Sequence, residues 1–413
     1  MKDSVYRRET CRLCSSSALE VVLPLTPTSL ADAYISADHL HEKQPVYPLD
    51  LYLCRDCGFS QLLDIVIPQV IYLDYIYETV SSLGLVDHFR RYANEVTAII
   101  KPPENALIVD IGSNDGTLLS FFKGHGMRVL GVDPARAIAR SATASGIETL
   151  PTFFTYDLAG KILNERGPAT IITANNLYAN VDDLATLTDA IHRLLSPDGV
   201  FVFESFYLAD WMQNMVFDFT YHEHLSYFSV KPLVSFFQSH DMELIDVQRV
   251  PTKGGSIRCI IQRAGGPRPV SPVIAELVEM ETKLGLHRAE TFKAFTARID
   301  EAKDQTSELI RSLLAQGKTI AGYGASATTT TLVYHFDLGD KLSFIADDYP
   351  AKQNLYSPGY HIPVLAPQAL YERKPDYVLI LAWRYADPII KKHKAFNEQG
   401  GKFIVPLPTL RII

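Results

Sequence analysis

Short apolar runs alternate with amphipathic stretches through the middle of the chain. Four runs have the length of buried strands: NALIVDIG, RVLGVD, ATIITAN and GVFVFES. Segments with helical periodicity, such as LATLTDAIHRLL, lie between them. This alternation predicts a parallel sheet with helices on both faces. The stretch from 230 to 263 then indicates one helix and two strands that close the same sheet.

A second series of strands and helices begins at about residue 316, with the runs KTIAGYGASA, KLSFIADD, YVLILAW and KFIVPLP. Before it lie a long polar helical stretch and the segment GGPRPVSP (265–272), whose Gly and Pro residues break helix and strand. We expect an α/β protein in three parts. Residues 1–67 form a small module of short strands and turns, residues 68–265 a first Rossmann-like domain, and residues 266–413 a second one.

Length and charge narrow the classes of function. A chain of 413 residues is long enough for two or three domains. Its formal net charge of −8 gives non-specific binding to nucleic acid no electrostatic support. No apolar run reaches the roughly 18–20 residues of a membrane-spanning helix, and the N-terminus lacks the apolar core of a signal peptide. We expect a cytoplasmic protein without nucleic-acid or membrane partners.

Four of the five cysteines form two CxxC pairs, Cys11 with Cys14 and Cys54 with Cys57. Each pair can offer two thiolates to one metal from a tight turn, so that both pairs together complete a tetrahedral zinc site. Two disulfides or a redox pair are the alternatives, but a chain without an export signal favours zinc. Because no general base or open ligand position lies nearby, we expect this zinc to be structural.

Two glycines, Gly112 and Gly116, follow the first apolar run, and a predicted helix begins directly after them. Small residues there let a ligand approach the backbone at the carboxyl edge of a parallel sheet. Asp133 ends the next run, where a carboxylate can accept both hydroxyls of an adenosine ribose. The spacing differs from the GxGxxG of a dinucleotide site. It resembles the first two motifs of class I methyltransferases, which use S-adenosylmethionine.

This resemblance implies further contacts to S-adenosylmethionine. PTFF (151–154) falls where adenine contacts usually lie, and ITANNLY (172–178) falls at the fourth strand end, facing the methyl donor. The cofactor-binding residues that it implies are Asp110, Gly112, Asn114, Asp115, Gly116, Asp133, Phe153, Phe154 and Asn175.

The second series contains Gly-x-Gly-x-x-Ala (322–327), with Asp347 after the following strand. This approximates a dinucleotide fingerprint and supports an alternative function, an NAD-dependent nucleotide-sugar oxidoreductase. The loop also suits the pyrophosphate of a nucleotide-sugar at a helix N-terminus. On that interpretation Gly324 and Ser326 bind substrate, and Lys352 either adds positive charge or is a solvated surface lysine.

The segment FTYHEHLSYF (219–228) has three interpretations. A metal site would need further ligands, because an extended HEH points Glu223 away from both histidines. A packing role suits the apolar residues, but burying His, Glu and His without a task is costly. We predict that His224 is a catalytic base, since imidazole has an ordinary pKa near 6.5. Glu223 would orient a histidine or bind a substrate hydroxyl, Tyr221 would stabilise an oxyanion or relay a proton, and His222 has no assigned role.

The motifs together resemble those of the sugar C-3 methyltransferases of deoxysugar pathways, over nearly the whole chain. These motifs are the double CxxC, the methyltransferase loop, YxEHLSYF, GGSxR (254–258), and GxGA with a Pro-x-Lys loop. The resemblance implies that His224 removes the C-3 proton of a nucleotide-linked 4-keto-6-deoxyhexose, and that the enolate attacks the methyl of S-adenosylmethionine. It implies substrate contacts at Tyr75, Tyr77, Asn176 and Asn180. We expect a thymidine- or guanosine-diphosphate sugar as substrate, and a monomer or weak homo-oligomer.

Two positions depart from the family pattern. Members often have histidine where Asn180 stands, which leaves the sugar identity or the stereochemistry open. Lysine often follows the GxGA loop, where this chain has Thr328, and this favours Lys352 or backbone amides as the groups that hold the phosphates. Two further alternatives are a binding or assembly module without activity and an O- or N-methyltransferase, which needs no strong carbon base.

Overall fold

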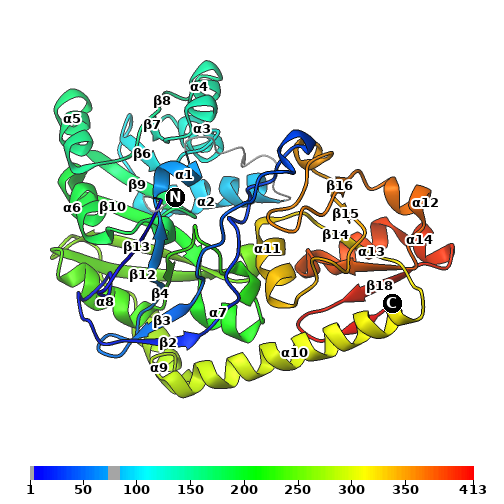
Figure 1. The fold of residues 1–413 in the computed structure, drawn as a ribbon. Helices are drawn as coiled ribbons and strands as arrows, with labels where there is room; N and C mark the ends of the chain where they lie inside the picture. The colour runs from blue at the N-terminus through cyan, green and yellow to red at the C-terminus, as the bar shows by residue number, and fades with distance from the viewer. Residues whose placement is uncertain (1–3, 73–83) are drawn as a thin grey trace. The chain divides into compact units, whose positions relative to one another are not determined.

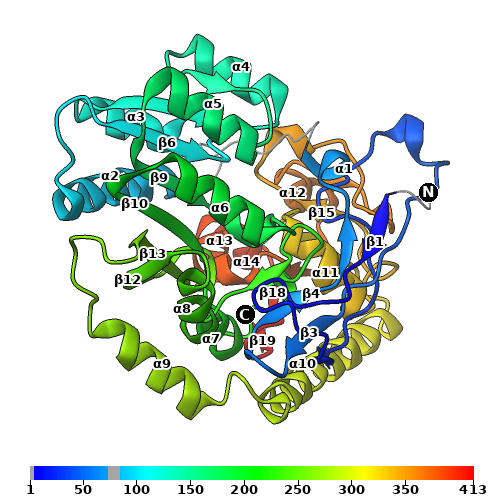
Figure 2. The ribbon, with the colours of Figure 1, turned by 90° about the vertical axis from the view of Figure 1, so that its left-hand side faces the viewer.

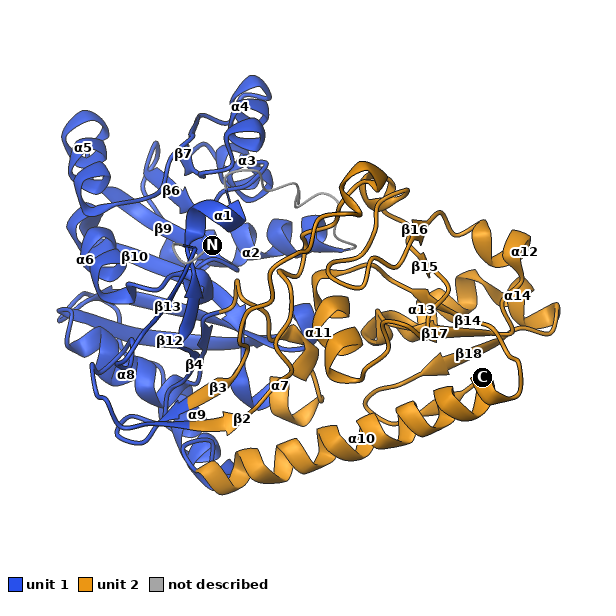
Figure 3. Ribbon diagram, viewed as in Figure 1, with its two compact units in different colours: residues 1–20, 53–210, 225–288 blue, residues 21–52, 211–224, 289–413 orange. Residues whose placement is uncertain are grey.

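The computed structural model describes residues 4–72 and 84–413 (Figure 1). The chain forms two compact units, each assembled from separate segments (Figure 3). Unit 1 comprises residues 1–20, 53–210 and 225–288, and unit 2 comprises residues 21–52, 211–224 and 289–413. The boundaries expected at 67/68 and 265/266 stay predictions. Within the two described ranges, no helix combines the length and the apolar character that crossing a bilayer requires.

Unit 1 contains a seven-stranded sheet. Its strands are β6 (Leu107–Ile111), β7 (Arg128–Val132), β8 (Thr149–Leu150), β9 (Ala169–Asn175), β10 (Leu195–Phe206), β12 (Met242–Val250) and β13 (Ser256–Arg263). Their order is β12-β13-β10-β9-β6-β7-β8. In this order, the five strands β10, β9, β6, β7 and β8 pair in parallel, whereas β13 runs antiparallel to both of its neighbours. This order, with one reversed strand, is that of the class I methyltransferase fold and confirms the prediction.

Helices cover both faces of this sheet. The helices of unit 1 are α1 (Pro68–Tyr72), α2 (Leu85–Ile100), α3 (Thr117–Gly124), α4 (Arg136–Ala144), α5 (Tyr156–Arg166), α6 (Leu184–Leu194), α8 (Val230–Gln238) and α9 (Val273–Leu284). One core cluster joins α2 and α3 to the face that carries Ile108, Ile171 and Val202. On the other face, Phe201 contacts Phe237 of α8, because successive strand residues alternate between faces. The helices α5 and α6 lie side by side (Figure 2).

The N-terminal module consists of short strands, as predicted. They are β1 (Val5–Arg7), β2 (Leu19–Leu23), β3 (Leu51–Cys54), β4 (Ser60–Leu62) and β5 (Asp64–Val66), with the 3-10 helix η1 (Ala37–His39). β1 pairs with β5 in the antiparallel sense. A second sheet has the order β11-β4-β3-β2, in which β11 is Ser226–Tyr227. The residues directly after the His-Glu-His segment therefore pair with the N-terminal module.

Unit 2 contains a six-stranded sheet, ordered β16-β15-β14-β17-β18-β19. Its strands are β14 (Ile320–Tyr323), β15 (Ile345–Ala346), β16 (Val364–Leu365), β17 (Tyr377–Ile380), β18 (Lys402–Val405) and β19 (Arg411–Ile412). All neighbours pair in parallel except β18 and β19. Its helices are α10 (Ala289–Ala315), α11 (Ala327–His335), α12 (Ala369–Arg373), α13 (Ala386–Lys392) and α14 (Lys394–Glu398). The predicted second Rossmann-like fold is confirmed.

Two connections shape the path of the chain. α7 (Leu208–Gln213) and the 3-10 helix η4 (Phe217–Phe219) lie where the chain passes from unit 1 into unit 2. The polar stretch after residue 272 forms α9 and α10 instead of a single helix. The break follows from Gly285, which ends α9 in the left-handed conformation with φ 71°.

Candidate active site

Residues with positive φ shape the loop after β6. Gly112 has φ 73°, Asn114 has φ 50° and Gly116 has φ 78°. A Cβ atom at Gly116 would lie 2.9 Å from Cγ2 of Ile147, so space as well as backbone conformation requires glycine. The loop therefore presents its backbone at the carboxyl edge of β6 before α3 begins.

Asp133 follows β7 and ties this loop to the neighbouring strand. Its Oδ2 accepts a hydrogen bond from the backbone N–H of Asn114 at 2.8 Å, and its Oδ1 accepts one from Ala135 at 2.8 Å. Burial raises the pKa of Asp133, and these two bonds oppose that shift. Since two carboxylate oxygens offer about four acceptor sites, lone pairs remain for the hydroxyls of a ribose.

Asp110 and Asp115, two other acids predicted to contact S-adenosylmethionine, make hydrogen bonds at the two ends of this loop. Asp110 is buried in β6, where its Oδ1 accepts a hydrogen bond from the hydroxyl of Thr173 at 2.6 Å. Burial raises the pKa of Asp110 to about 7. Asp115 accepts hydrogen bonds from the backbone N–H of Thr117 at 3.0 Å and from its hydroxyl at 2.6 Å, and so holds the start of α3.

The other residues predicted to contact S-adenosylmethionine lie at the ends of neighbouring strands. Phe153 and Phe154 follow β8 and are partly exposed, as stacking against an adenine requires. Asn175 ends β9 beside the hydroxyl of Tyr92. Together with Asp133 and the glycine loop, these side chains line one edge of the unit 1 sheet. The residues predicted to bind the methyl donor therefore fit S-adenosylmethionine.

A buried charged cluster lies near the end of β10 and was not predicted from the sequence. The carboxylate of Glu204 accepts hydrogen bonds from Nε2 of His88 at 2.7 Å and from Thr252 at 3.0 Å, and it pairs with Arg258 at 3.2 Å. Desolvation acts to raise the pKa of Glu204, but these partners leave it below its ordinary value. The sequence pattern that could have indicated Glu204 is an apolar strand that ends in an acid, and the same pattern singled out Asp133.

The predicted catalytic residues form a tight turn within unit 2. The backbone N–H of His224 donates to the carbonyl of Tyr221 at 2.8 Å, and Nδ1 of His224 lies 2.9 Å from the carbonyl oxygen of Phe219. Because a carbonyl only accepts, Nδ1 carries the proton, and in the neutral form of the ring Nε2 would be the basic nitrogen. The ring centroids of Tyr221 and His224 are 4.0 Å apart. Glu223, between them in the same turn, is 9% exposed.

The C-terminal half of unit 2 holds the segment that precedes this turn. The hydroxyl of Thr331 on α11 donates to the carbonyl of Thr220 at 2.6 Å. Nε1 of Trp383 donates to Asp218 at 2.8 Å. Since these bonds flank Phe219, residues 111 and 165 positions further along the chain fix the carbonyl that orients the predicted base.

His222 has a structural role in the same turn. Its Nε2 lies 3.3 Å from the carbonyl oxygen of Tyr47 and 3.2 Å from that of Pro48. Complete burial lowers the pKa of His222 to about 4, although the two carbonyls oppose this shift. Within the part of the chain that the structure describes, only the four paired cysteines form a cluster of potential metal ligands. His222 is therefore a neutral packing residue.

The buried state of His222 predicts a pH-dependent stability. Its folded pKa of about 4 lies below the unfolded value near 6.5, so the unfolded state binds more protons between these values. The contribution is complete above pH 6.5 and declines as the pH falls toward 4, by up to about 1.4 kcal/mol per pH unit. Urea titrations should give a shallower decline for His222→Asn than for the wild type. The two tryptophans, Trp211 and Trp383, both belong to unit 2 and report its unfolding. Equal slopes for both proteins would contradict the assignment.

The glycine-rich loop after β14 repeats the arrangement of the first loop. Gly324 has φ 102°, and a Cβ atom there would lie 2.5 Å from Cβ of Ala382. The acid after the next strand, Asp347, accepts hydrogen bonds from the backbone N–H groups of Ala325 at 2.5 Å and Tyr349 at 2.7 Å. Both Rossmann-like folds thus use a strand-terminal acid to hold the preceding loop.

Two predicted phosphate contacts lie at this second loop. Ser326 caps α11, and its hydroxyl lies 3.2 Å from that of Thr329. Lys352 is only 9% exposed, which excludes a solvated surface lysine. Its Nζ donates to Asp32 at 2.7 Å and to the carbonyl of Ala325 at 2.9 Å. The charge of Lys352 is therefore paired inside unit 2.

The predicted sugar contacts of unit 1 lie after β9. Asn176 has φ 55° and donates its backbone N–H to the carbonyl of Glu204 at 2.8 Å. Asn180 ends the 3-10 helix η3 (Tyr178–Asn180), and its Oδ1 is buried without a hydrogen-bond partner among the described residues. Such an oxygen can accept a hydrogen bond from a ligand. Tyr75 and Tyr77 lie outside the described residues.

The four paired cysteines fit a zinc ion. All four Sγ atoms lie within 4.8 Å of one another, with Cys11 and Cys57 3.6 Å apart and Cys14 and Cys54 3.6 Å apart. Zn–S bonds of about 2.3 Å in a tetrahedron place sulfur atoms roughly 3.8 Å apart. Both of these Sγ–Sγ distances are far longer than a disulfide bond of about 2.05 Å. The zinc prediction is confirmed in preference to disulfides.

Three family models match successive parts of the chain. A zinc binding domain matches residues 11–72, a methyltransferase domain matches residues 86–247, and a C-methyltransferase C-terminal domain matches residues 251–408. Together they span the zinc module, the class I methyltransferase fold and the second Rossmann-like fold.

Known proteins of two kinds are similar to this chain. The C-methyltransferase NovU of Streptomyces niveus is 34% identical over all of this chain and 99% of its own length. A solved S-adenosylmethionine-dependent methyltransferase of Clostridium acetobutylicum is 14% identical and covers 44% of this chain and 92% of its own, with a TM-score of 0.35. The CcbJ methyltransferase of Streptomyces caelestis is 13% identical and covers 43% and 90%, with a TM-score of 0.34. On the full-length similarity and the domain matches, this chain belongs to the family of S-adenosylmethionine-dependent C-methyltransferases with an N-terminal zinc module, as its resemblance to the deoxysugar enzymes predicts.

Proposed function

We propose that this C-methyltransferase methylates C-3 of a nucleotide-linked 4-keto-6-deoxyhexose. The observation that carries the proposal is the contact of Nδ1 of His224 with the carbonyl oxygen of Phe219 at 2.9 Å, since a proton on Nδ1 makes Nε2 the basic nitrogen of a neutral imidazole. A carbon acceptor needs such a base, because a C–H group must lose its proton before it can attack a methyl group. Oxygen and nitrogen acceptors already carry a lone pair.

In the proposed reaction, Nε2 of His224 takes the proton from C-3. The C-4 ketone acidifies that proton, because the charge left on C-3 spreads to the C-4 oxygen as an enolate. Tyr221 donates a hydrogen bond to that oxygen, and Glu223 accepts one from a sugar hydroxyl. S-adenosylmethionine, which Asp133 and the loop at 112–116 would hold, supplies an electrophilic methyl group for C-3; its methyl–sulfur bond breaks, and S-adenosylhomocysteine leaves. His224 then releases its proton to solvent.

The nucleotide diphosphate is proposed to bind the loop at 322–327. Three features support this assignment: the positive φ of Gly324, the cap at Ser326, and the backbone N–H groups at the start of α11. The paired charge of Lys352 acts on this loop through its bond to the carbonyl of Ala325. The oxidoreductase alternative is disfavoured, because the chain is a C-methyltransferase.

Incubation with S-adenosylmethionine and a keto-sugar tests the function. The thymidine-diphosphate and guanosine-diphosphate 4-keto-6-deoxyhexoses should be compared, and the product analysed by NMR. We expect one of them to gain a methyl group on C-3, which becomes a quaternary carbon. In deuterated buffer with S-adenosylhomocysteine, the same sugar should exchange its C-3 proton, because deprotonation precedes methyl transfer.

Two results would contradict this proposal. A new methyl group on oxygen or nitrogen would establish a different acceptor. Calorimetric binding of NAD without binding of S-adenosylmethionine would restore the oxidoreductase alternative.

A further inference from the structure

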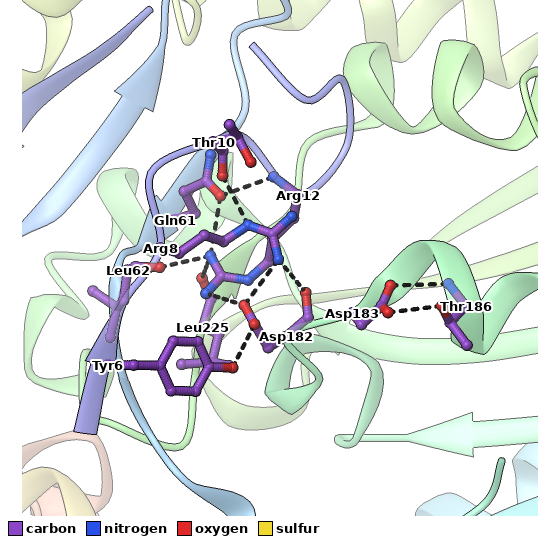
Figure 4. Close-up of polar contacts among 10 residues, drawn as sticks. All are labelled: Tyr6, Arg8, Thr10, Arg12, Gln61, Leu62, Asp182, Asp183, Thr186 and Leu225. Atoms are coloured by element: carbon purple, nitrogen blue, oxygen red, sulfur yellow. Dashed lines mark hydrogen bonds and ion pairs between the residues drawn. The ribbon is translucent and has the colours of Figure 1, made fainter. Parts of the chain in front are cut away.

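Arg12 lies between two zinc ligands, but its buried side chain binds the protein around it (Figure 4). The side chain is 0% exposed. NH1 donates to Oε1 of Gln61 at 3.0 Å, to the carbonyl of Leu62 at 2.6 Å and to the carbonyl of Leu225 at 3.3 Å. Gln61 also accepts a hydrogen bond from the backbone N–H of Arg12 at 3.1 Å. One guanidinium therefore joins the first CxxC pair, β4 and the backbone at Leu225.

Asp182 is the anionic partner of Arg12. Its Oδ1 pairs with NH2 of Arg12 at 3.0 Å and with NH1 of Arg8 at 3.2 Å, and its Oδ2 accepts a hydrogen bond from the hydroxyl of Tyr6 at 2.6 Å (Figure 4). Asp182 lies two residues beyond Asn180, a predicted sugar contact. The N-terminal module therefore holds this loop through three side chains.

Leu225 is the second target of Arg12, and its backbone is held on both sides. Its N–H donates to the carbonyl of Ala179 at 2.8 Å, and its carbonyl accepts a hydrogen bond from the N–H of Leu62 at 2.9 Å as well as from Arg12. Ala179 belongs to η3, which ends at Asn180. Leu225 directly follows His224 in the chain.

We propose that Arg12 is a positioning residue, through which the zinc-bound CxxC pair fixes the backbone next to His224. The zinc ligands Cys11 and Cys14 fix the backbone of Arg12, and its guanidinium transmits that position to Leu225 and Asp182. Loss of the side chain leaves buried carbonyl oxygens with fewer donors, which loosens this backbone. The catalytic part of the proposal rests on the proposed role of His224 as the base.

Arg55 provides a matched control at the corresponding position of the second CxxC pair. It follows Cys54 as Arg12 follows Cys11. Its side chain is 68% exposed, and it pairs with Glu20 at 2.7 Å near the surface. Replacement of either arginine by methionine removes one charge beside a zinc ligand, but only Arg12 reaches Leu225.

The experiment compares Arg12→Met and Arg55→Met in the full-length, zinc-loaded protein. We expect both variants to retain the wild-type zinc content and affinity for S-adenosylmethionine. Hydrogen exchange of peptides covering residues 219–228 should accelerate about tenfold or more in Arg12→Met alone. Turnover with the nucleotide keto-sugar should fall about 10- to 100-fold in Arg12→Met, mainly in kcat, and stay near the wild-type value in Arg55→Met. Arg12→Lys should recover only part of the loss, because a lysine keeps the charge but not the several fixed donors.

The outcomes separate the two proposals. Equal exchange rates in the two variants, at full zinc content, would overturn the positioning role whatever His224 does. Faster exchange with unchanged kcat would also overturn it. Faster exchange in a protein whose His224→Asn variant still turns over would instead refute the role of His224 and leave the Arg12 contact intact. If Arg12→Met does not fold, Asp182→Asn tests the same contact, and unchanged exchange in that variant would contradict the proposal.

Discussion

Replacement of His224 by asparagine is expected to lower turnover by about 10²- to 10⁴-fold, the range that a general base contributes. Asparagine can still donate a hydrogen bond to the carbonyl of Phe219, so the turn should persist, but it offers no basic nitrogen in place of Nε2. Binding of S-adenosylmethionine should be unchanged, because its predicted contacts lie at Asp133 and the loop at 112–116. Steady-state kinetics and calorimetric titration measure the two effects separately.

His222→Asn is the control, since it makes the same chemical change two residues away at a buried histidine whose Nε2 lies against the carbonyls of Tyr47 and Pro48. That variant should retain most of its turnover at pH 7. Exchange of the C-3 proton should disappear in His224→Asn and persist in His222→Asn. Near-normal turnover in His224→Asn, or loss of exchange in both variants, would exclude His224 as the specific base.

Removal of the zinc ion is expected to abolish the order of the N-terminal module and the activity with it. Structural zinc sites contribute apparent binding free energies of about 10–16 kcal/mol, which is comparable to the stability of a whole domain. The strands of this module are only three to five residues long, so they have little core of their own. Chelation, or Cys54→Ser, should produce fast hydrogen exchange across residues 4–66 and a loss of turnover.

Cys259→Ala is the matched control for the zinc experiment. Cys259 is a buried free cysteine on β13 and is not part of the four-cysteine cluster. The variant should keep one zinc per chain and the native exchange pattern of the module. A protein that keeps its module protected and its activity intact after complete removal of zinc would show that the ion is dispensable.

Much of the fold follows from the local pattern of the chain. The runs NALIVDIG and ATIITAN became β6 and β9 because strand-length apolar segments next to amphipathic helices can be buried in only a few ways. The zinc cluster followed from spacing alone, since a CxxC turn fixes the direction of its thiolates. Gly116 was predicted from its place between an apolar run and a helix. The structure requires glycine there, because φ is 78° and a Cβ atom would meet Ile147.

The roles of the two neighbouring histidines depend on distant residues. His222 is neutral because it is completely buried, and part of its surroundings, the carbonyls of Tyr47 and Pro48, comes from about 175 positions earlier in the chain. His224 is oriented by Phe219, whose neighbours are held by the C-terminal half of unit 2. The local sequence HEH indicates neither the environment of His222 nor the orientation of His224. It favours a base at one histidine, but it cannot give the tautomer of that ring.

Buried charges were the least predictable features. Lys352 was a candidate for a solvated lysine, yet it pairs with Asp32, which lies 320 positions away. Arg258 belongs to the GGSxR motif and Glu204 ends an apolar run, but their buried ion pair was not predicted. Such pairs form only when tertiary structure brings two desolvated charges together, so a local pattern can point to one member but not to the pair.

The path of the chain has a consequence for how the protein is made. The chain leaves unit 1 after Asp210, contributes residues 211–224 to unit 2, and returns at Leu225. The side chains that hold this segment, Thr331 and Trp383, are synthesised 111 and 165 positions after the residues that they bind. The methyl-donor sheet can therefore fold while the predicted base is still unsupported. We therefore expect a chain at that stage to bind S-adenosylmethionine before the predicted base is ordered, and to transfer no methyl group.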